Sequence, residues 1–412
     1  MNIWLINHYA VPPQYYPLAR PTNFAKYLMK MGHTVKVFAA STVHNSDQNL
    51  IADNAPYREE TVDGVSYVYI KCHHYRGSGV KRVYNICEFA WKLPGVCKHF
   101  EKPDAIVATS MPPTSCAVGI HLARKYGCRG VAEIADLWPE SIVAYGIAGP
   151  KNPAIIALRW LEKWIYTKAD ALVFTMEGAY DYIMEQGWEN EIPKSKVHYI
   201  NNGVDLALYD QNIRAHVIED PDLDDPDTFK VIYAGSIRKA NGLGELMDCA
   251  SQLRDHPKIR FLVYGKGDDL EMMRQRCESE GLQNITFKGA VTKNNVPYIL
   301  SKSDINVLNY NADTVAVYRF GSSQNKLFEY FASGKPVLSN IDIAYSLIHR
   351  YACGISEELS TGEKYAEAVL RLYNLPKEEY DRMCANARQA ACDYDFKVLT
   401  EKLFSVIEGI QK

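Results

Sequence analysis

The stretch KVIYAGSIRKANGLGELMDCASQLRDHPKIRFLVYGKGDD (230–269) decides the fold. It opens with a short β-branched run, KVIYAGS (230–236), passes through a helical pattern near 242–254 and ends in a second buried run, IRFLVYG (259–265). A strand, a helix and a strand in this order indicate a βαβ unit. The same alternation continues from end to end of the chain, which predicts an α/β protein with parallel sheets wound by helices.

The alternation falls into two halves. In the first half, strands are predicted at 2–6, 34–39, 65–70, 105–109, 130–134, 171–174 and 197–200, with helices near 20–31, 83–99, 114–126, 153–167 and 177–186. In the second half, strands are predicted at 230–236, 259–265, 284–290, 304–309 and 336–340, with helices near 242–254, 267–279, 294–301, 323–332, 361–373, 376–390 and 394–410.

We therefore predict a first domain over 1–205, a second over 206–385 and a last segment, 386–412, that packs back on the first domain. An acidic segment at 213–228 lacks apolar periodicity and is interpreted as a linker. The two domains are expected to face one cleft with the carboxyl ends of their strands, where open α/β sheets bind ligands.

Composition limits the class of protein and its location. The chain has 412 residues and a net charge of −3, which gives no support to nucleic-acid binding. Its ten cysteines contain no CxxC pair, and MNIWLINHYA at the N-terminus is interpreted as a strand and not as a signal peptide. We expect reduced thiols in a cytoplasmic protein. No apolar run approaches the roughly 18 residues of a membrane span, so any membrane contact is expected to be peripheral.

The segment SSQNKLFEYFASGKPVLSN (322–340) places one carboxylate, Glu329, in a run that is otherwise typical of a buried helix and strand. Ser322 and Ser323 are expected N-caps, Gly334 ends the helix, and Glu329 is expected about two turns in. Such a loop-to-helix junction leaves free N–H groups where an anion can bind. From these residues alone, Glu329 is either a solvated helix-surface charge or a ligand-binding group.

Six segments in order resemble the retaining glycosyltransferases of family four, which have the GT-B architecture. They are PPQYYPLARPTNFAKYLMKMGHTVKV (12–37), ADLWPES (135–141), YINNGVD (199–205), YAGSIRKANGL (233–243), VYGKGDD (263–269) and NKLFEYFASGKPV (325–337). The second and last are similar to the subgroup that builds bacterial capsules and O-antigens, resembling the N-acetyl-L-fucosamine transferases. The resemblance covers essentially the whole chain. It implies two Rossmann-like domains, the first for the acceptor and the second for the nucleotide sugar.

The resemblance assigns donor-binding roles in the second half. It implies that Glu329 accepts hydrogen bonds from both ribose hydroxyls of a nucleotide sugar, a task that suits the two oxygens of a carboxylate. The family usually has a second glutamate eight residues earlier, where this chain has Gly321. Contacts to the transferred sugar are therefore expected from backbone amides around Phe320, Gly321 and Ser322, and Ser323 is a further donor-binding candidate.

The predicted diphosphate site consists of residues from two segments, YAGSIRKANGL (233–243) and NKLFEYFASGKPV (325–337). Gly235 and Ser236 follow a strand and can approach a phosphate closely, while Arg238 and Lys239 can neutralise it. The resemblance implies that this basic pair stabilises the departing diphosphate in place of a metal. The alternative is that both are ordinary surface charges. Lys326 is a further diphosphate candidate.

The turn VYGKGDD resembles the base-binding turn of the family. Gly265 and Gly267 are predicted to let the backbone come near a planar base. A glycine pair is a weak signal by itself.

The acceptor is assigned to the first half. Asp136 is predicted to orient the acceptor hydroxyl or accept its proton, with a turn or N-cap aspartate as the alternative; Glu140 is a weaker second candidate. The loop NHYAVPPQYYPLAR (7–20) resembles the acceptor loop without its usual paired glycines. The acceptor candidates in this loop are His8, Tyr15, Tyr16 and Arg20. His8 is more typical of a structural histidine, and for Arg20 a phosphate contact is ranked slightly above a structural salt bridge.

Two further patterns concern metals and membranes. No His, Cys and carboxylate cluster has ligand spacing, so no metal or other cofactor is expected besides the nucleotide-sugar co-substrate. Segments 80–100 and 157–168 interleave basic and aromatic residues, which suits either an interfacial helix on an anionic membrane or a core-facing helix with a solvated side.

Together with these features, the resemblance implies a retaining, metal-independent glycosyltransferase at the cytoplasmic side of the plasma membrane. Its donor is expected to be UDP-linked, with an N-acetylamino sugar as the candidate, and its acceptor a lipid-linked or free oligosaccharide, with undecaprenyl diphosphate as the candidate carrier, in capsule or O-antigen synthesis. Two alternatives stay open: a nucleotide-sugar epimerase of GT-B fold, and a non-catalytic nucleotide-sugar-binding protein.

Overall fold

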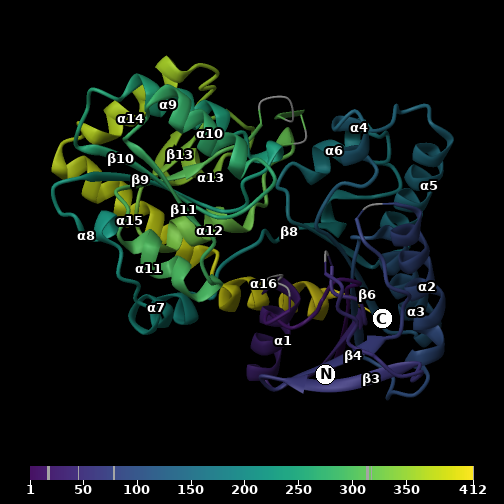
Figure 1. The fold of residues 1–412 in the computed structure, drawn as a ribbon. Coiled ribbons are helices and arrows are strands. Elements are labelled where there is room, and N and C mark those ends of the chain that lie inside the picture. Colours follow the sequence, from purple (N-terminus) through teal and green to yellow (C-terminus); the bar gives the residue numbers. More distant parts are fainter. Residues whose placement is uncertain (16–18, 45, 78, 312–314, 317, 412) are drawn as a thin grey trace. The chain divides into compact units, whose positions relative to one another are not determined.

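The computed structural model describes residues 1–15, 19–44, 46–77, 79–311, 315–316 and 318–411. The chain divides into two compact units, one of Met1–Asn201 with Phe396–Lys412 and the other of Asn202–Asp395. Each unit contains a sheet of parallel strands wound by helices, so the predicted α/β class with two parallel sheets is confirmed (Figure 1).

The sheet of the first unit has eight strands in the order β3-β4-β2-β1-β5-β6-β7-β8. They are β1 (Asn2–Ile6), β2 (Thr34–Ala40), β3 (Tyr57–Val62), β4 (Val65–Ile70), β5 (Ala105–Thr109), β6 (Arg129–Ile134), β7 (Ala171–Phe174) and β8 (Val197–Tyr199). All pairs are parallel except β3 with β4. The strand order reverses between β1 and β5, and ligands of such sheets bind beyond the carboxyl ends of the strands at that point.

Helices cover both faces of this sheet. They are α1 (Ala19–Lys30), α2 (Val80–Cys97), α3 (Pro113–Tyr126), α4 (Glu140–Ala144), α5 (Pro153–Lys168), α6 (Ala179–Glu185) and α16 (Phe396–Gly409). The helices α2, α3 and α5 lie side by side on one face, since α3 contacts both neighbours, and α1 packs with α16 on the other (Figure 1). This division follows from right-handed crossovers.

The sheet of the second unit has six parallel strands in the order β11-β10-β9-β12-β13-β14. They are β9 (Phe229–Ala234), β10 (Ile259–Tyr264), β11 (Ile285–Gly289), β12 (Ile305–Leu308), β13 (Val337–Ser339) and β14 (Gly354–Ser356). The helices are α7 (Leu206–Ala215), α8 (Pro221–Asp224), α9 (Gly244–Gln252), α10 (Leu270–Glu280), α11 (Val296–Ser301), α12 (Asn325–Ala332), α13 (Leu347–Tyr351), α14 (Gly362–Tyr373) and α15 (Lys377–Asp393). Its strand order reverses between β9 and β12.

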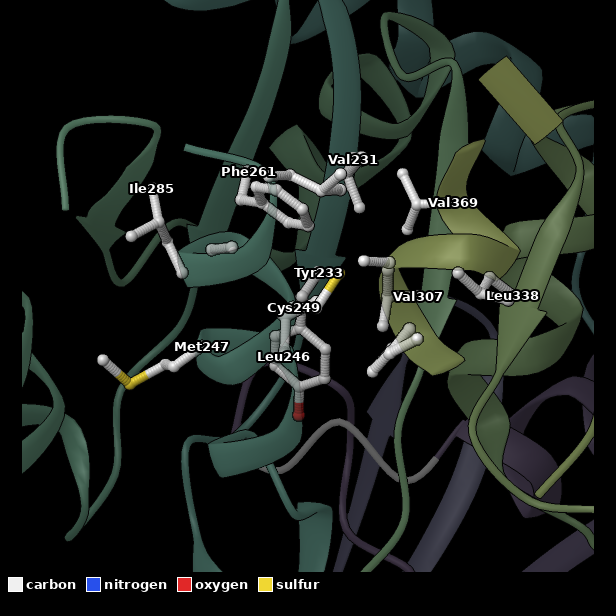
Figure 2. Close-up of a cluster of buried hydrophobic side chains, with 14 of the residues drawn as sticks. Val231, Tyr233, Leu246, Met247, Cys249, Phe261, Ile285, Val307, Leu338 and Val369 are labelled. Atoms are coloured by element: carbon white, nitrogen blue, oxygen red, sulfur yellow. The ribbon is translucent and has the colours of Figure 1, made fainter. Parts of the chain in front are cut away.

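The core of the second unit packs around the strands at which this order reverses. Val231, Phe261 and Val307 come from neighbouring strands and pack with Leu246 of α9 and Val369 of α14 (Figure 2). These side chains are buried because the strands are apolar on both faces, as parallel strands between two helix layers must be.

The structure differs from three predictions, which concern the limits of the domains, the acidic linker and the start of one helix. The chain passes between the units after Asn201 and again after Asp395, so α15 belongs to the second unit and α16 alone returns to the first. The acidic segment predicted as a linker packs within the second unit. Its buried Asp220 accepts hydrogen bonds from Tyr264 (2.8 Å) and Lys288 (2.6 Å), which anchor α8 to β10 and β11. The third is the start of α12, which begins at Asn325 with Gln324 as N-cap, so Ser322 and Ser323 precede it and Glu329 lies one turn in.

Candidate functional site

The predicted donor residues of the second unit gather where its strand order reverses. The loop after β9, the end of β12 and the start of α12 meet there, at the carboxyl ends of the strands. Tyr330 ties two of these elements together, because its hydroxyl lies 3.2 Å from both the backbone N and the carbonyl oxygen of Ala234. Helix α12 and the end of β9 therefore form one rigid support.

Lys326 is a half-buried cation with neutral partners. Its Nζ donates to Asn241 Oδ1 (3.0 Å) and to the hydroxyl of Tyr233 (3.2 Å), and it lies 4.8 Å from the centre of the Tyr233 ring. No carboxylate pairs with it among the residues that the structure describes. Burial lowers the pKa of Lys326 to about 7. A desolvated ammonium group at the start of a helix is a site that favours an anion.

The loop after β9 lies beside Lys326 and carries the other residues of the predicted diphosphate site. The space that a Cβ at Gly235 would fill lies 3.4 Å from Lys326 Nζ, so this glycine leaves room next to the cation. Asn241 holds the loop in place by donating to the carbonyl oxygen of Ser236 (2.8 Å). Arg238 and Lys239 are exposed on the same loop, so the structure leaves both the phosphate role and the surface-charge alternative in place.

Gly265 and Gly267 have a packing function that the sequence did not indicate. A Cβ at Gly265 would lie 1.8 Å from the carbonyl oxygen of Gly235, and one at Gly267 would lie 1.9 Å from that of Ile237. The neighbouring loop after β9 thus occupies the space that these glycines leave. The backbone at Gly265 and Gly267 thus comes close to this loop. Its predicted approach to a planar base remains a prediction.

The segment before α12 explains the departure from the family pattern at Gly321. Its φ is +110°, a backbone conformation that glycine adopts and that a glutamate would adopt only with strain. The adjacent Ser322 Oγ lies 2.9 Å from the hydroxyl of Tyr310, at the end of β12, and the Ser323 carbonyl accepts from Asn202 (2.6 Å). The segment is thereby fixed in front of the helix.

Glu329 is ion-paired in this structure. Its carboxylate contacts Nζ of Lys293, and 18% of its side chain is exposed against 56% for the lysine. The carboxylate is therefore mostly covered and is not the freely solvated surface charge of the first alternative. Lys293 has a long, exposed side chain, and exposed ion pairs are weak. The hydroxyls of a diol can therefore compete with the Lys293 ammonium group for the carboxylate oxygens of Glu329.

In the first unit, Asp136 follows β6 at the carboxyl edge of the sheet. Burial raises the pKa of Asp136 to about 6, and its side chain keeps partial exposure. Among the described residues no hydrogen bond or ion pair to this carboxylate is found. A carboxylate in this state has the proton affinity that a general base near neutral pH needs.

Arg20 and Glu140 each form an ion pair within the first unit. Arg20 Nε donates to Glu133 (2.8 Å), and its Nη2 donates to the carbonyl of Ile200 (2.8 Å). This buried arrangement favours the structural salt bridge over the predicted phosphate contact. Glu140 pairs with Arg159, which joins α4 to α5, and its acceptor contact stays a prediction.

The acceptor loop is built on a buried histidine. His8 is fully buried between the rings of Tyr9 (4.5 Å) and Phe89 (5.1 Å), and burial lowers its pKa to about 3, so it is neutral. Among the described residues neither ring nitrogen has a hydrogen-bond partner, so both the acceptor contact and the structural interpretation of His8 stay predictions. Tyr15 is half-buried after the turn at Pro12, whereas Tyr16 and Pro17 lie outside the described residues.

Tyr9 of this loop, Arg82 and His44 form a polar group that the sequence did not predict. Arg82 donates from Nε and Nη2 to the hydroxyl of Tyr9 (3.1 and 3.0 Å), and the ring of His44 lies 5.0 Å from that of Tyr9. They come from three separate segments, so no motif joins them.

The described part of the chain contains neither a cluster suited to a metal ion nor a helix suited to span a membrane. No group of three or more His, Cys, Asp or Glu side chains is placed to hold a metal ion. No helix in it is long and apolar enough to cross a membrane.

Two family models match consecutive parts of the chain. The model described as Glycosyltransferase Family 4 matches residues 21–208, and the model described as Glycosyl transferases group 1 matches residues 217–390. The chain is 25% identical over 304 residues to WcaI of Escherichia coli (strain K12), named as a colanic acid biosynthesis glycosyl transferase. That match covers 69% of this chain and 71% of the relative.

Solved structures share the fold over the full length. A sucrose-phosphate synthase from Thermosynechococcus elongatus has a TM-score of 0.72 at 15% identity, covering 99% of this chain and 98% of its own. WaaG, a glycosyltransferase involved in lipopolysaccharide biosynthesis, has a TM-score of 0.64 at 14% identity, covering 99% of this chain and 100% of its own. At these identities the similarity establishes the GT-B architecture.

Proposed function

The chain belongs to glycosyltransferase family 4, and from this premise we propose that it transfers a sugar, with retention, from a UDP-linked sugar to a lipid-linked or free oligosaccharide. An N-acetylamino sugar is the first donor to test. The surface polysaccharides that the named relatives serve, colanic acid and lipopolysaccharide, support a role in capsule or O-antigen assembly, on an undecaprenyl diphosphate carrier at the inner face of the plasma membrane.

One observation supports the donor assignment: Lys326, at the start of α12, is half-buried and has no anionic partner among the described residues. A nucleoside diphosphate supplies the missing negative charge. Arg238 and Lys239, exposed on the neighbouring loop, can add to it as charge develops on the leaving diphosphate. These three cations are proposed to replace a metal ion.

Glu329 is proposed to bind the ribose. We expect Glu329→Ala to lower the affinity for UDP about tenfold or more, because one or two charged hydrogen bonds are lost. Calorimetric titration with UDP and with 2′-deoxy-UDP measures this. The wild type should discriminate between the two nucleotides, and the variant should bind both alike.

The matched control is Lys293→Met, which removes the partner of Glu329 and leaves the carboxylate in place. This variant should bind UDP at least as tightly as the wild type. If Lys293→Met loses affinity as Glu329→Ala does, the ion pair only supports the fold and the ribose assignment is wrong.

Asp136 is proposed to orient or deprotonate the acceptor hydroxyl. Because its pKa is raised to about 6, acceptor-dependent UDP release should fall as the pH drops below about 6. Asp136→Asn should reduce turnover roughly a hundredfold and remove this acidic limb, with UDP affinity unchanged. Glu101→Gln, at an exposed carboxylate of the same unit, is the control. An acidic limb that persists in Asp136→Asn would assign the proton transfer to another group.

A further inference from the structure

The outer surface of the helices α2, α3 and α5 carries charge of one sign. These three helices contain two carboxylates, Glu88 and Glu162, and both are buried. Their lysines and arginines are Lys81, Arg82, Lys92, Arg124, Lys125, Arg159, Lys163 and Lys168. Three of these pair with carboxylates, namely Lys92 with Glu88, Arg159 with Glu140, and Lys163 with Glu191. The exposed charge that these helices contribute is therefore positive.

Large apolar side chains stand out among these cations. Trp91 of α2 and Trp160 of α5 are each 81% exposed. Tyr84 lies seven residues before Trp91, and Ile156 lies four before Trp160, so each tryptophan continues an exposed stripe along its helix. Exposed tryptophans in two stripes, one on each side of α3, are costly in water and are typical of an interaction surface.

A hollow beside Trp91 adds a second feature. It has a volume of about 680 Å³ and is lined by Trp91, Lys71, Lys92 and His99, with Tyr57 at the sheet edge. Lys71 and His99, on a wall that also contains Tyr57, Trp91 and Val96, suit a phosphate headgroup with its attached chain.

We propose that this basic-aromatic face, defined by Tyr84, Trp91, Ile156, Trp160, Lys81, Arg124, Lys125 and Lys168, docks on the surface of an anionic bilayer. The tryptophan and tyrosine rings enter the headgroup region, where amphipathic rings are favoured, and the cations contact lipid phosphates. The assignment deepens the proposed function and rests on it for the lipid-linked acceptor. It names one surface and its partner.

Vesicle sedimentation tests the proposal with the full-length chain. The wild type should sediment with vesicles of equal parts phosphatidylglycerol and phosphatidylcholine, should stay in solution with phosphatidylcholine alone, and should dissociate as salt is raised. Trp91→Ser with Trp160→Ser should weaken binding roughly tenfold or more, as should Lys81→Gln with Arg124→Gln and Lys125→Gln.

Matched controls lie in the second unit. Leu208→Ser with Met272→Ser removes exposed apolar side chains there, and Lys258→Gln with Arg274→Gln and Lys364→Gln removes exposed charges. Both controls should bind vesicles like the wild type. Equal losses in the controls, or a wild type that stays in solution with both vesicles, would overturn the proposal, as would a tryptophan variant that changes only the oligomeric state.

Titration of every variant with UDP separates this inference from the proposed function. The tryptophan and charge variants should retain the UDP affinity of the wild type, which also shows that they are folded. Vesicle binding without UDP binding would keep the docking surface and remove the donor assignment.

Discussion

Replacing Lys326 by methionine is expected to lower the affinity for UDP by about a hundredfold at pH 7 and to abolish its dependence on pH. The charged hydrogen bonds that the ammonium group makes to a diphosphate are worth about 1.5–3 kcal/mol each. Because the pKa of Lys326 is lowered to about 7 in the unliganded protein, a bound diphosphate must raise it. Above pH 7 the wild type must therefore take up a proton on binding, and its affinity falls by up to about tenfold per pH unit.

Calorimetry in two buffers of different ionisation enthalpy measures this proton directly. The wild type should show proton uptake that approaches one per UDP as the pH rises above 7, where the terminal phosphate of UDP is already ionised. Lys326→Met should show none. Lys335→Met, which removes a lysine just beyond the end of α12, should behave like the wild type. Proton uptake that survives in Lys326→Met would place the responsible group elsewhere.

Gly267→Ala is expected to lower the free energy of unfolding by about 3 kcal/mol. The added methyl carbon would lie 1.9 Å from the carbonyl oxygen of Ile237 and 2.5 Å from its carbonyl carbon. Both atoms belong to backbone, so the loop after β9 must shift as a whole, and overpacking of this kind is costly. Since the same loop carries Asn241, which holds Lys326, UDP affinity should fall as well.

Urea denaturation measures the stability, and Gly244→Ala provides the control. This substitution adds the same methyl group at the first residue of α9, with nothing within 4 Å of it, and should be neutral or stabilising by up to about 1 kcal/mol. Equal stabilities of the two variants would mean that the loops around Gly267 adapt without cost.

The sequence predicted the buried strands well and the marginal ones poorly. Interior parallel strands are continuous apolar runs between turns, which is a strong local signal. Strand β3, YREETV, has three consecutive charged residues at the edge of the sheet, and β14 has only three residues, so neither contains such a run. The linker interpretation failed because Asp220 obtains its partners from strands far away in the sequence.

The candidate site was predictable only where a motif named the residue. Lys326 and Glu329 lie in one short segment, and its resemblance to the family was sufficient to select both. The partner of Arg20 is Glu133, and that of Glu329 is Lys293. Pairs so distant in the sequence leave no local pattern, so these ion pairs could not be predicted, and the ligand contacts of both residues stay predictions. The packing role of Gly267 was hidden for the same reason.

The return of α16 to the first unit sets an order for folding during synthesis. The ribosome produces Met1–Asn201 first, yet α1 obtains its partner α16 only after the whole of Asn202–Asp395 has been made. Phe24, whose ring packs edge-on against Phe396 at 5.7 Å, stays without that cover throughout. The nascent first unit therefore exposes an apolar surface that a chaperone can bind, while the second unit can complete its fold before the first.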